Sequence, residues 1–444
     1  MHHFHSTRRS FFKRTALAAA ATGVPAWFLE QSLDAADSPI PTLANDKPNI
    51  ALIGCGGMGR NDATLASVFG NVVAVCDVDT KRAEAASQQF GGAKIFTDFR
   101  KVLEHKDLQA VINATPDHWH TFINIAALRA GKDVYSEKPL TLTIDEGKRL
   151  VDEVRKSKGI LQTGSQQRSD SLFRLACDLV RNGRIGKLRH VSVVLPAGAH
   201  KGPFTSSPVP AELDWDQWQG QARATDFMIQ RAHGSFRYWL DYSGGTLTDW
   251  GAHHHDIALW GMGLDRSGPV SVEGKRMVEE IPGGYDAPSQ YRVKYTYANG
   301  VTQTTESTLR NRLDGSVDES QSTDLPLHGV KFEGSDGWIF VTRGKIEGSS
   351  KDLIEEPLTT RSVELDVSND HMGNFFDSIR SRNPAICDAE IGHRSVSVCH
   401  LGVAAIRLGR KLNWNPELEQ FVNDSEADGL LAREQRKPFD YDRS

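Results

Sequence analysis

The 444-residue sequence predicts an α/β domain with a doubly wound parallel sheet, followed by an α+β domain with a mostly antiparallel sheet and helices on one face. Two observations support this division. Between residues 48 and 164, strand-like segments alternate with helical ones, which is typical of a parallel sheet covered on both faces. Further along the chain, strand-like segments are joined by hairpin-turn signals at Asn299-Gly300 and Asp336-Gly337.

The N-terminus has the pattern of a twin-arginine export signal. Thr7-Arg8-Arg9-Ser10-Phe11-Phe12-Lys13 precedes an apolar, alanine-rich stretch from about Thr15 to Leu29. The stretch is shorter than the roughly 20 apolar residues that a membrane-spanning helix needs, and Ala35-Ala36 suits a cleavage site. We therefore expect a signal peptide at 1–36, a linker at 37–47, and a periplasmic or other extracytoplasmic protein without stable membrane insertion.

The composition is that of a soluble globular protein. Hydrophobic residues make up 39% of the chain and charged residues 25%, which is enough apolar material for two cores. The formal net charge is -5 and the body of the chain has no long basic run, so no nucleic-acid partner is expected. Five cysteines without C-x-x-C spacing argue against a zinc or redox site and give little support for a disulfide framework.

The first domain is expected to contain six strands, each next to a helical stretch. These strands are Asn49 to Ile53, Val72 to Cys76, Ala93 to Phe96, Ala110 to Ala114, Asp133 to Ser136 and Ile160 to Thr163. Ligands bind such sheets at the carboxyl ends of the strands, so the residues that follow each strand are the candidates for function.

A glycine-rich turn follows the first strand. Gly54-Cys55-Gly56-Gly57-Met58-Gly59 has the G-x-G-x-x-G spacing between a strand and a helix, which is the context of a dinucleotide-binding loop. The first glycine makes the tight turn, the second admits the pyrophosphate, and the third allows close helix packing. The pyrophosphate is then held at the helix N-terminus. The competing interpretation is a glycine-rich turn in an unrelated α/β domain.

The second strand ends in Asp77, where a carboxylate can accept hydrogen bonds from the ribose diol of NAD. The same charge would repel the 2′-phosphate of NADP, so NAD is favoured. Lys81 and Arg82 are close enough in sequence to leave NADP possible.

Two more motifs follow strands of this sheet. Thr115-Pro116-Asp117-His118-Trp119-His120 comes after the fourth strand, and Glu137-Lys138-Pro139 comes after the fifth. A residue before proline is disfavoured in a helix, which predicts an extended or turn conformation for Lys138. From there its side chain can project into the cleft.

The second domain is expected to contain a sheet with one face covered. Its strands are Lys187 to Pro196, Val270 to Val278, Tyr291 to Tyr297, Val301 to Thr308, Val330 to Glu333 and Gly337 to Thr342. Tyr291, Val293, Tyr295 and Tyr297 alternate on one face, as in a sheet with one side buried. The other face is either solvated or an oligomer interface.

The motif Asp249-Trp250-Gly251-Ala252-His253 lies between these strands. Asp249 and His253 are four residues apart, so on a helix they point to one side. His253 can accept a hydroxyl proton, and Asp249 can orient it or bind a neighbouring hydroxyl. Consecutive histidines are roughly 100° apart around a helix and cannot all ligate one ion, so no metal is expected. His254 is expected to pack or to contact substrate.

Taken together, these motifs resemble the Gfo/Idh/MocA oxidoreductases, from about Lys47 to the C-terminal region. The resemblance implies an NAD(P)-binding Rossmann domain over residues 48–164 and an open-faced sheet domain for substrate binding and oligomerisation over residues 165–444. It also implies a homo-oligomer, a dimer or a tetramer. In this family the catalytic set matches Lys138, Asp249 and His253. The expected cofactor-binding residues are Gly54, Gly56, Gly57, Met58, Gly59, Asp77, Thr115, Pro116, His120, Glu137 and Lys138.

Two aromatic stretches, Leu213 to Gly220 and Phe236 to Tyr242, resemble exported, carbohydrate-related members of the family. Aromatic faces can stack on sugar rings, with core packing as the competing account of the tryptophans. The candidate substrate-binding residues are Arg168, Trp215, Arg237 and His254.

The expected reaction is hydride transfer from a sugar or polyol carbon to NAD or NADP, with His253 taking the hydroxyl proton and Lys138 stabilising the alkoxide. An exported enzyme has no obvious nicotinamide pool, which favours a tightly held cofactor and a redox-neutral cycle. One alternative is an NAD-dependent glycosidase that works by oxidation, elimination and reduction. The other is a sugar-binding or sensing protein without catalysis, because a fold alone does not establish an activity.

Overall fold

The computed structural model describes residues 24–29, 47–308 and 328–441. The predicted export signal and linker lie almost wholly outside these ranges and stay predictions. Of the signal, only residues 24–29 are described, and Phe28 is buried among the core residues of the second domain. No helix in the described ranges is both long enough and apolar enough to cross a membrane.

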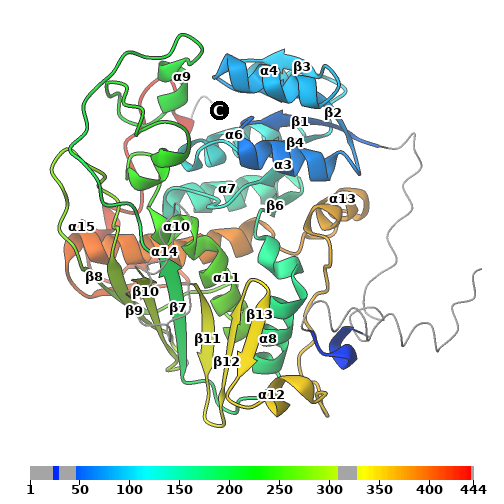
Figure 1. The fold of residues 1–444 in the computed structure, drawn as a ribbon, viewed down its shortest axis with the longest axis vertical. Coiled ribbons are helices and arrows are strands. Elements are labelled where there is room, and N and C mark those ends of the chain that lie inside the picture. The colour runs from blue at the N-terminus through cyan, green and yellow to red at the C-terminus, as the bar shows by residue number, and fades with distance from the viewer. Residues whose placement is uncertain (1–23, 30–46, 309–327, 442–444) are drawn as a thin grey trace, which may run out of the picture.

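The first domain is built on a six-stranded parallel sheet with the order β3-β2-β1-β4-β5-β6, which confirms the predicted doubly wound architecture (Figure 1). The strands are β1 (Asn49–Ile53), β2 (Asn71–Cys76), β3 (Lys94–Phe96), β4 (Ala110–Asn113), β5 (Asp133–Ser136) and β6 (Leu161–Thr163). The chain reverses direction across the sheet between β1 and β4. The carboxyl ends of these two strands border the crevice where such sheets bind ligands.

Five helices connect these strands: α3 (Gly57–Ala66), α4 (Thr80–Gln89), α5 (Phe99–Leu103), α6 (Asp117–Arg129) and α7 (Ile144–Ser157). Side chains cap three of them, since Asp79, Asp98 and Thr143 accept hydrogen bonds from first-turn N–H groups of α4, α5 and α7. In contrast, α3 has no side-chain cap. Its first turn follows the glycine loop directly.

The second domain contains a nine-stranded sheet with the order β13-β12-β11-β7-β10-β9-β8-β14-β15. The strands are β7 (His190–Pro196), β8 (Ser271–Arg276), β9 (Tyr291–Thr296), β10 (Thr302–Thr308), β11 (Gly329–Glu333), β12 (Trp338–Thr342), β13 (Lys345–Gly348), β14 (Leu412–Asn415) and β15 (Gln420–Phe421). The β7–β10 pair is parallel and the other pairs are antiparallel. Asn299-Gly300 connects β9 to β10 and Asp336-Gly337 connects β11 to β12, as their turn signals predicted.

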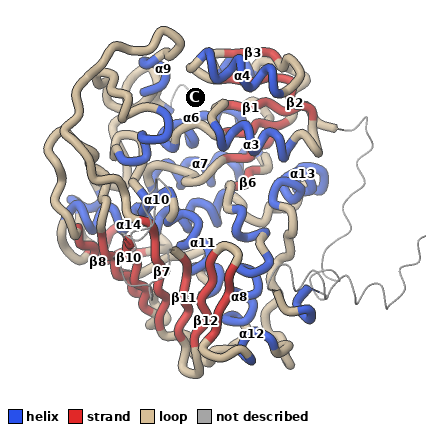
Figure 2. The backbone as a smooth tube through the Cα atoms, viewed as in Figure 1, coloured by secondary structure: helices blue, strands red, loops and turns tan. Residues whose placement is uncertain are grey.

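Helices cover one face of this sheet, which confirms the mostly antiparallel, one-sided layer. They are α8 (Ser171–Arg181), α11 (Gly251–Met262) and α14 (Ala389–Leu408). Tyr291, Val293 and Tyr295 are buried, and the Tyr295 hydroxyl donates to the carbonyl of Val398 on α14 at 3.1 Å. In Figure 2, α11 and α14 lie between the six-stranded sheet above and the nine-stranded sheet below.

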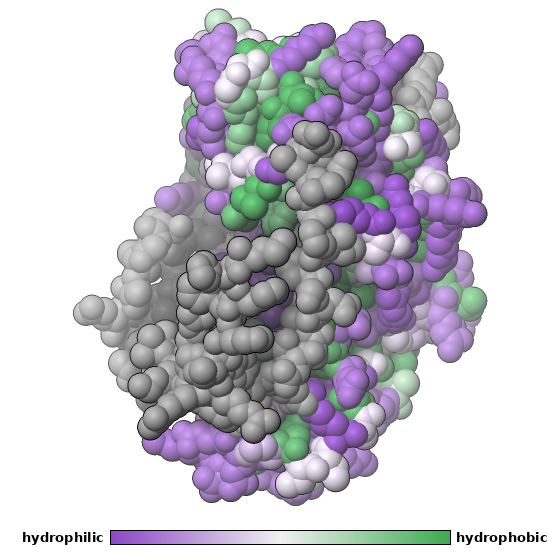
Figure 3. All heavy atoms as spheres, turned by 90° about the vertical axis from the view of Figure 1, so that its right-hand side faces the viewer, coloured by the Kyte–Doolittle hydropathy of each residue, from purple (hydrophilic) through white to green (hydrophobic). Residues whose placement is uncertain are grey.

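The remaining short elements are η2 (Gln166–Ser169), α9 (Trp215–Gln219), η3 (His233–Tyr238), α10 (Thr246–Asp249), α12 (Asp352–Glu355), α13 (His371–Ser381) and α15 (Ser425–Asp428). Where Figure 3 colours the surface, it is largely hydrophilic, with hydrophobic residues in separate groups. Among the exposed apolar residues of the first domain are Leu65 on α3 and Val68 just after it.

A long connection between β7 and α10, residues 197–245, returns from the second domain to the first. We call it the cover segment. Leu213 forms an isolated antiparallel bridge with Asp79, and the backbone of Asp214 donates to the carbonyl of Val78 at 3.0 Å. The segment also has an apolar core of its own, which includes Trp215, Trp218 and Tyr242. The cover segment is therefore a packed structure that is fixed over the carboxyl edge of the parallel sheet.

The C-terminal tail braces the cover segment against the first domain. The Arg436 side chain donates to the carbonyl of Gly220 at 2.9 Å. Phe439 packs edge-on against Trp119 of α6, with ring centroids 5.7 Å apart. The cover segment and the C-terminal tail thus meet on the first domain.

Candidate active site

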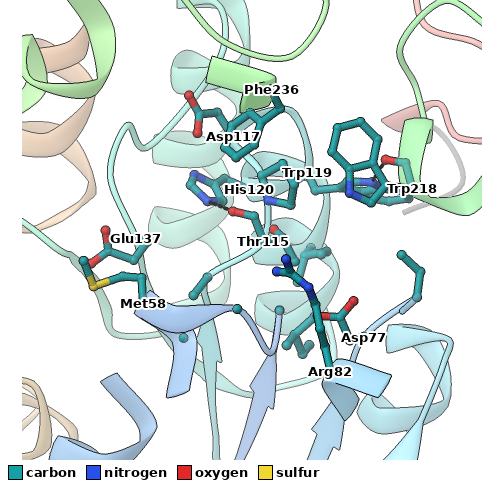
Figure 4. Close-up of a pocket in the computed structure, with 18 of the residues that line it drawn as sticks. Met58, Asp77, Arg82, Thr115, Asp117, Trp119, His120, Glu137, Trp218 and Phe236 are labelled. Atoms are coloured by element: carbon teal, nitrogen blue, oxygen red, sulfur yellow. Dashed lines mark hydrogen bonds between the residues drawn. The ribbon is translucent and has the colours of Figure 1, made fainter. Parts of the chain in front are cut away.

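A cavity of about 330 Å³ lies between the carboxyl edge of the parallel sheet and the cover segment (Figure 4). In Figure 4, Asp77 and Arg82 lie at one end of the cavity, and His120 and Glu137 lie toward the other. The lining residues that the sequence indicated are Gly54, Gly56, Gly57, Met58, Gly59, Asp77, Thr115, Pro116, His120, Glu137, Lys138 and Arg237. The cover segment contributes Gln217, Trp218, His233, Gly234 and Phe236 in addition to Arg237.

The glycine loop has the geometry that a bound pyrophosphate requires. Gly54 has φ +91°, and a Cβ there would lie 2.6 Å from the backbone of Ala114. A Cβ on Gly59 would lie 2.0 Å from the carbonyl oxygen of Gly54. A Cβ on Gly57 would meet open space, because this residue lines the cavity at the uncapped N-terminus of α3. The residues present therefore fit the diphosphate of a dinucleotide.

At the adenosine end of the cavity, Asp77 is held by the backbone of the first domain. Its two carboxylate oxygens accept hydrogen bonds from the backbone N–H groups of Cys55 at 2.7 Å and Asp79 at 2.9 Å. Burial raises the pKa of Asp77 in spite of these two donors. Arg82 lies beside the glycine loop, since its Nη1 would be 3.2 Å from a Cβ on Gly56.

His120 holds two backbone turns together at the middle of the cavity. Its Nδ1 lies 2.7 Å from the carbonyl oxygen of Pro139, and its Nε2 lies 2.8 Å from that of Thr115. Burial lowers the pKa of His120, against the two carbonyl oxygens and Glu137, which favour the charged ring. The sequence predicted a cofactor contact, but both ring nitrogens face protein carbonyls. His120 therefore positions the turns that carry Thr115 and Lys138 while it lines the cavity.

At the reaction end, side chains from both domains meet on Asp249. Lys138, which follows β5, places its Nζ 2.7 Å from Asp249 Oδ1, and the Arg237 Nε lies 3.2 Å from the same oxygen. Burial alone would raise the pKa of Asp249, but Lys138 and Arg237 outweigh it and hold the pKa well below its ordinary value. Asp249 is therefore ionised over the whole physiological range.

His253 lies one helical turn beyond Asp249, on α11. Burial and the nearby Lys138 ammonium lower its pKa well below the ordinary value, so the imidazole is neutral. Its Nδ1 has no hydrogen-bond partner. The sequence indicated that Asp249 orients His253 or binds a neighbouring hydroxyl; in the structure, Lys138 and Arg237 donate hydrogen bonds to its carboxylate. A neutral ring with an unpartnered nitrogen can accept a proton.

Two buried carboxyl groups that the sequence analysis did not single out lie near this cluster. Asp117 accepts a hydrogen bond from Ser243, and burial raises its pKa to about 7. Asp62 on α3 is 1% exposed and its Oδ2 has no partner; burial and the neighbouring Glu137 raise its pKa to about 9. Asp117 lies in the Thr-Pro motif, but its burial depends on Ser243, which is 126 residues away in sequence.

Three predicted substrate-binding residues have other roles. Arg168 is 2% exposed and makes hydrogen bonds of 2.7 and 2.8 Å to Asp256, so it is part of the core. Trp215 stacks on Trp218 at 4.8 Å, inside the cover segment. His254 is fully buried and packs on His328, in line with the packing alternative. Of the four candidates, only Arg237 lines the cavity. The described ranges contain no group of three or more histidine, cysteine or acidic side chains able to hold a metal ion.

Two family models match most of the chain. One, described as "Oxidoreductase family, NAD-binding Rossmann fold", matches residues 48–165. The other, described as "Oxidoreductase family, C-terminal alpha/beta domain", matches residues 198–441.

Curated relatives include inositol dehydrogenases. The chain is 26% identical over 233 residues to the myo-inositol 2-dehydrogenase of Thermotoga maritima, covering 52% of this chain and 59% of that protein. It is 31% identical over 171 residues to the inositol 2-dehydrogenase of Salmonella typhimurium, covering 38% and 48%. The chain therefore spans about half the length of the curated relatives it matches.

Solved structures share the whole fold. Levoglucosan dehydrogenase in complex with NADH and levoglucosan superposes with a TM-score of 0.60 at 17% identity, over 83% of this chain and 99% of that one. The WlbA dehydrogenase from Bordetella pertussis, in complex with NADH and UDP-GlcNAcA, superposes with a TM-score of 0.61 at 18% identity, over the same shares of the two chains. At these identities, the likeness establishes the fold.

Proposed function

The chain belongs to the Gfo/Idh/MocA oxidoreductase family, with an NAD-binding Rossmann domain, and from that premise we propose that it oxidises a hydroxyl-bearing carbon of a sugar, polyol or sugar derivative. The observation that carries the proposal is the contact of 2.7 Å between Lys138 and Asp249 across the two domains, beside a neutral His253. Lys138 also lines the cavity whose other end is the glycine loop.

Bound NAD supplies the hydride acceptor, and the protein supplies the proton chemistry. Lys138 donates a hydrogen bond to the substrate oxygen and stabilises the negative charge that develops on it. His253 accepts the hydroxyl proton and becomes an imidazolium. The substrate C–H bond breaks with its electron pair going to the acceptor, and a carbonyl forms. Asp249 keeps Lys138 in place and offsets the charge gained by His253.

The cover segment supports the further proposal that NAD is held tightly and reduced and reoxidised in place. The segment is fixed by the backbone bridge between Leu213 and Asp79 and closes the cavity with Trp218 and Phe236. Tight binding would suit the twin-arginine export predicted from the sequence, because an exported enzyme must keep its cofactor. We propose this localisation, and a homo-oligomeric state, on the sequence patterns alone.

The test combines cofactor identification with single-turnover kinetics. Nucleotide released by denaturing the purified protein is identified by mass, and stoichiometric NAD(H) is expected. The native protein is then mixed with neutral and acidic sugars and with inositols while nicotinamide absorbance is followed. Lys138→Ala should abolish reduction without changing nucleotide content, whereas the exposed control Lys156→Ala should do neither. Undiminished reduction in Lys138→Ala would overturn the proposal.

A further inference from the structure

The turn between β12 and β13 carries an arginine next to the reaction end. Arg343 and Gly344 form this turn, and the Arg343 guanidinium lies 5.0 Å from the ring centroid of Trp250. Trp250 directly follows Asp249 in the chain. The hairpin therefore brings a positive charge beside the α10–α11 junction, from a strand pair that no sequence motif connected with the site.

Contacts with α11 and its N-cap Trp250 fix the position of the hairpin. His328, just before β11, stacks on His254 with centroids 5.2 Å apart, and its Nδ1 lies 3.1 Å from His254 Nε2. The Thr342 hydroxyl lies 3.1 Å from the same Nδ1, and the His328 ring is 4.7 Å from that of Trp250. Because Thr342 precedes Arg343, this packing determines where the guanidinium is presented.

Among the described residues, Arg343 makes no hydrogen bond or ion pair. The acidic groups near enough to interact with it are already engaged. Asp170 caps α8 by accepting from the backbone of Leu172 at 2.8 Å, and Asp249 is shared by Lys138 and Arg237. Glu137 accepts a hydrogen bond of 2.8 Å from Gln166. Asp170, Asp249 and Glu137 act on the Arg343 charge from a distance, but no carboxylate of the described residues forms an ion pair with it.

Three cationic side chains therefore gather at the reaction end. Lys138 and Arg237 form ion pairs with Asp249, and Arg343 is a further cation that pairs with none of the described carboxylates. Burial lowers the pKa of both His254 and His328, the latter to about 4, so these rings add no charge at neutral pH. The Arg343 side chain is exposed, and an exposed guanidinium without an ion-pair partner among the described residues can bind a carboxylate or a phosphate.

We propose that Arg343 forms an anion subsite beside the reaction end, and that the substrate is an acidic sugar or polyol whose carboxylate or phosphate binds this guanidinium. That the bound anion is a substrate rests on the proposed hydride transfer. Binding of the anion at Arg343 does not depend on that reaction. Arg343 in this scheme is a specificity residue. It leaves the proton chemistry to Lys138 and His253.

The test measures binding by calorimetry on the purified full-length protein, with D-glucuronate, D-glucose 6-phosphate and D-glucose as probes. The wild type should bind at least one anion about tenfold or more tightly than glucose, and this preference should weaken with added salt. The two anions separate a carboxylate subsite from a phosphate subsite. Arg343→Gln should remove the preference, and Arg343→Lys should restore part of it. Lys345→Gln, which removes a charge from the same hairpin, should keep it.

Two results would overturn the subsite: binding of glucose as tight as that of either anion, or a preference that survives in Arg343→Gln. Nicotinamide reduction is recorded with the same compounds. Reduction by none of them would count against the proposed hydride transfer, whereas the dissociation constants would still decide the subsite. The two proposals can therefore fail separately.

Discussion

Each end of the site has a carboxylate fixed by hydrogen bonds, and the pKa of that carboxylate is shifted in opposite directions at the two ends. At the adenosine end, Asp77 receives two backbone N–H groups, and burial still raises its pKa. At the reaction end, Asp249 receives a lysine and an arginine, and its pKa falls well below the ordinary value. Neutral amide donors fix a carboxylate in position, whereas full charges also overcome the cost of burying it.

The two ends of the site also differ in which parts of the chain form them. The partners of Asp77 are Cys55 and Asp79, from the same domain and within 22 residues in sequence. Lys138 lies 111 residues from Asp249, in the other domain. The first domain alone therefore supplies the donors that hold Asp77, while the reaction end forms only when both domains are docked.

The largest effect is expected when the charge at the reaction end is removed. Asp249→Asn keeps the size of the side chain but leaves Lys138 and Arg237 without their counter-ion, so the lysine loses its fixed position. Turnover should fall by roughly 10²- to 10³-fold, as for loss of a positioned acid–base group. The measurement is single-turnover nicotinamide reduction at saturating sugar. Bound NAD should stay stoichiometric, and loss of the cofactor would contradict the division of roles between the two ends.

The matching change at the adenosine end should alter binding rather than chemistry. Asp77→Asn removes the charge, and its amide can no longer accept from both Cys55 and Asp79. NAD should dissociate about tenfold faster, as expected for one lost charge-assisted hydrogen bond, while the rate of reduction within the complex stays the same. Stopped-flow release of NADH measures the first quantity and single turnover the second. In the double variant with Asp249→Asn the two effects should add, because the sites share no partner.

Asp117, near the reaction end, should make the stability of the protein depend on pH. Burial raises its pKa from 3.8 to about 7, so between these values the folded protein holds a proton that the unfolded chain has lost. Its contribution to stability is complete below pH 3.8 and is lost as pH rises toward 7, with a slope of about 1.4 kcal/mol per pH unit. Asp117→Asn should remove this slope from urea-unfolding free energies measured across that range.

Asp249→Asn provides the control for the pH experiment. Because its pKa is lowered in the folded state, Asp249 contributes stability above the unfolded value of 3.8 and loses it only as pH falls further. The Asp249 charge also helps to raise the pKa of Asp117, so removing it should lower that pKa. Asp249→Asn should therefore lower stability and shorten the pH range over which stability falls, whereas an unchanged range would show that Asp249 is not ionised there.

The sequence could predict the adenosine end because its signals are local. Gly54 to Gly59 and Asp77 directly follow strands that the apolar sequence pattern predicts. These residues together predicted NAD binding. The reaction-end residues Lys138, Asp249 and His253 came from a family resemblance, since periodicity cannot show that positions 138 and 249 meet.

The wrong predictions named suitable residue types, but the side chains pack inside the protein and do not line the cavity. Trp215 and Arg168 are residue types that bind sugars, but Trp215 stacks on Trp218 and Arg168 pairs with Asp256 inside the core. Arg343 was missed for the converse reason, because its role depends on a hairpin that packs on Trp250 from 93 positions away in the sequence. Tertiary packing decides where these side chains lie, and it cannot be inferred from a single sequence.

The smallest effect should come from the ion pair that links the cover segment to α4. Lys81 pairs with Glu212, but the lysine side chain is 72% exposed. Next to this pair, the backbone of Thr80 donates to the carbonyl of Glu212 at 2.9 Å, and Leu213 bridges Asp79. Solvent screens an exposed pair, so Lys81→Gln should change the NADH release rate by less than about twofold. If release instead accelerates as much as in Asp77→Asn, the cover is held by charge and not by its backbone bridge. The adenosine end would then depend on side-chain charges as the reaction end does.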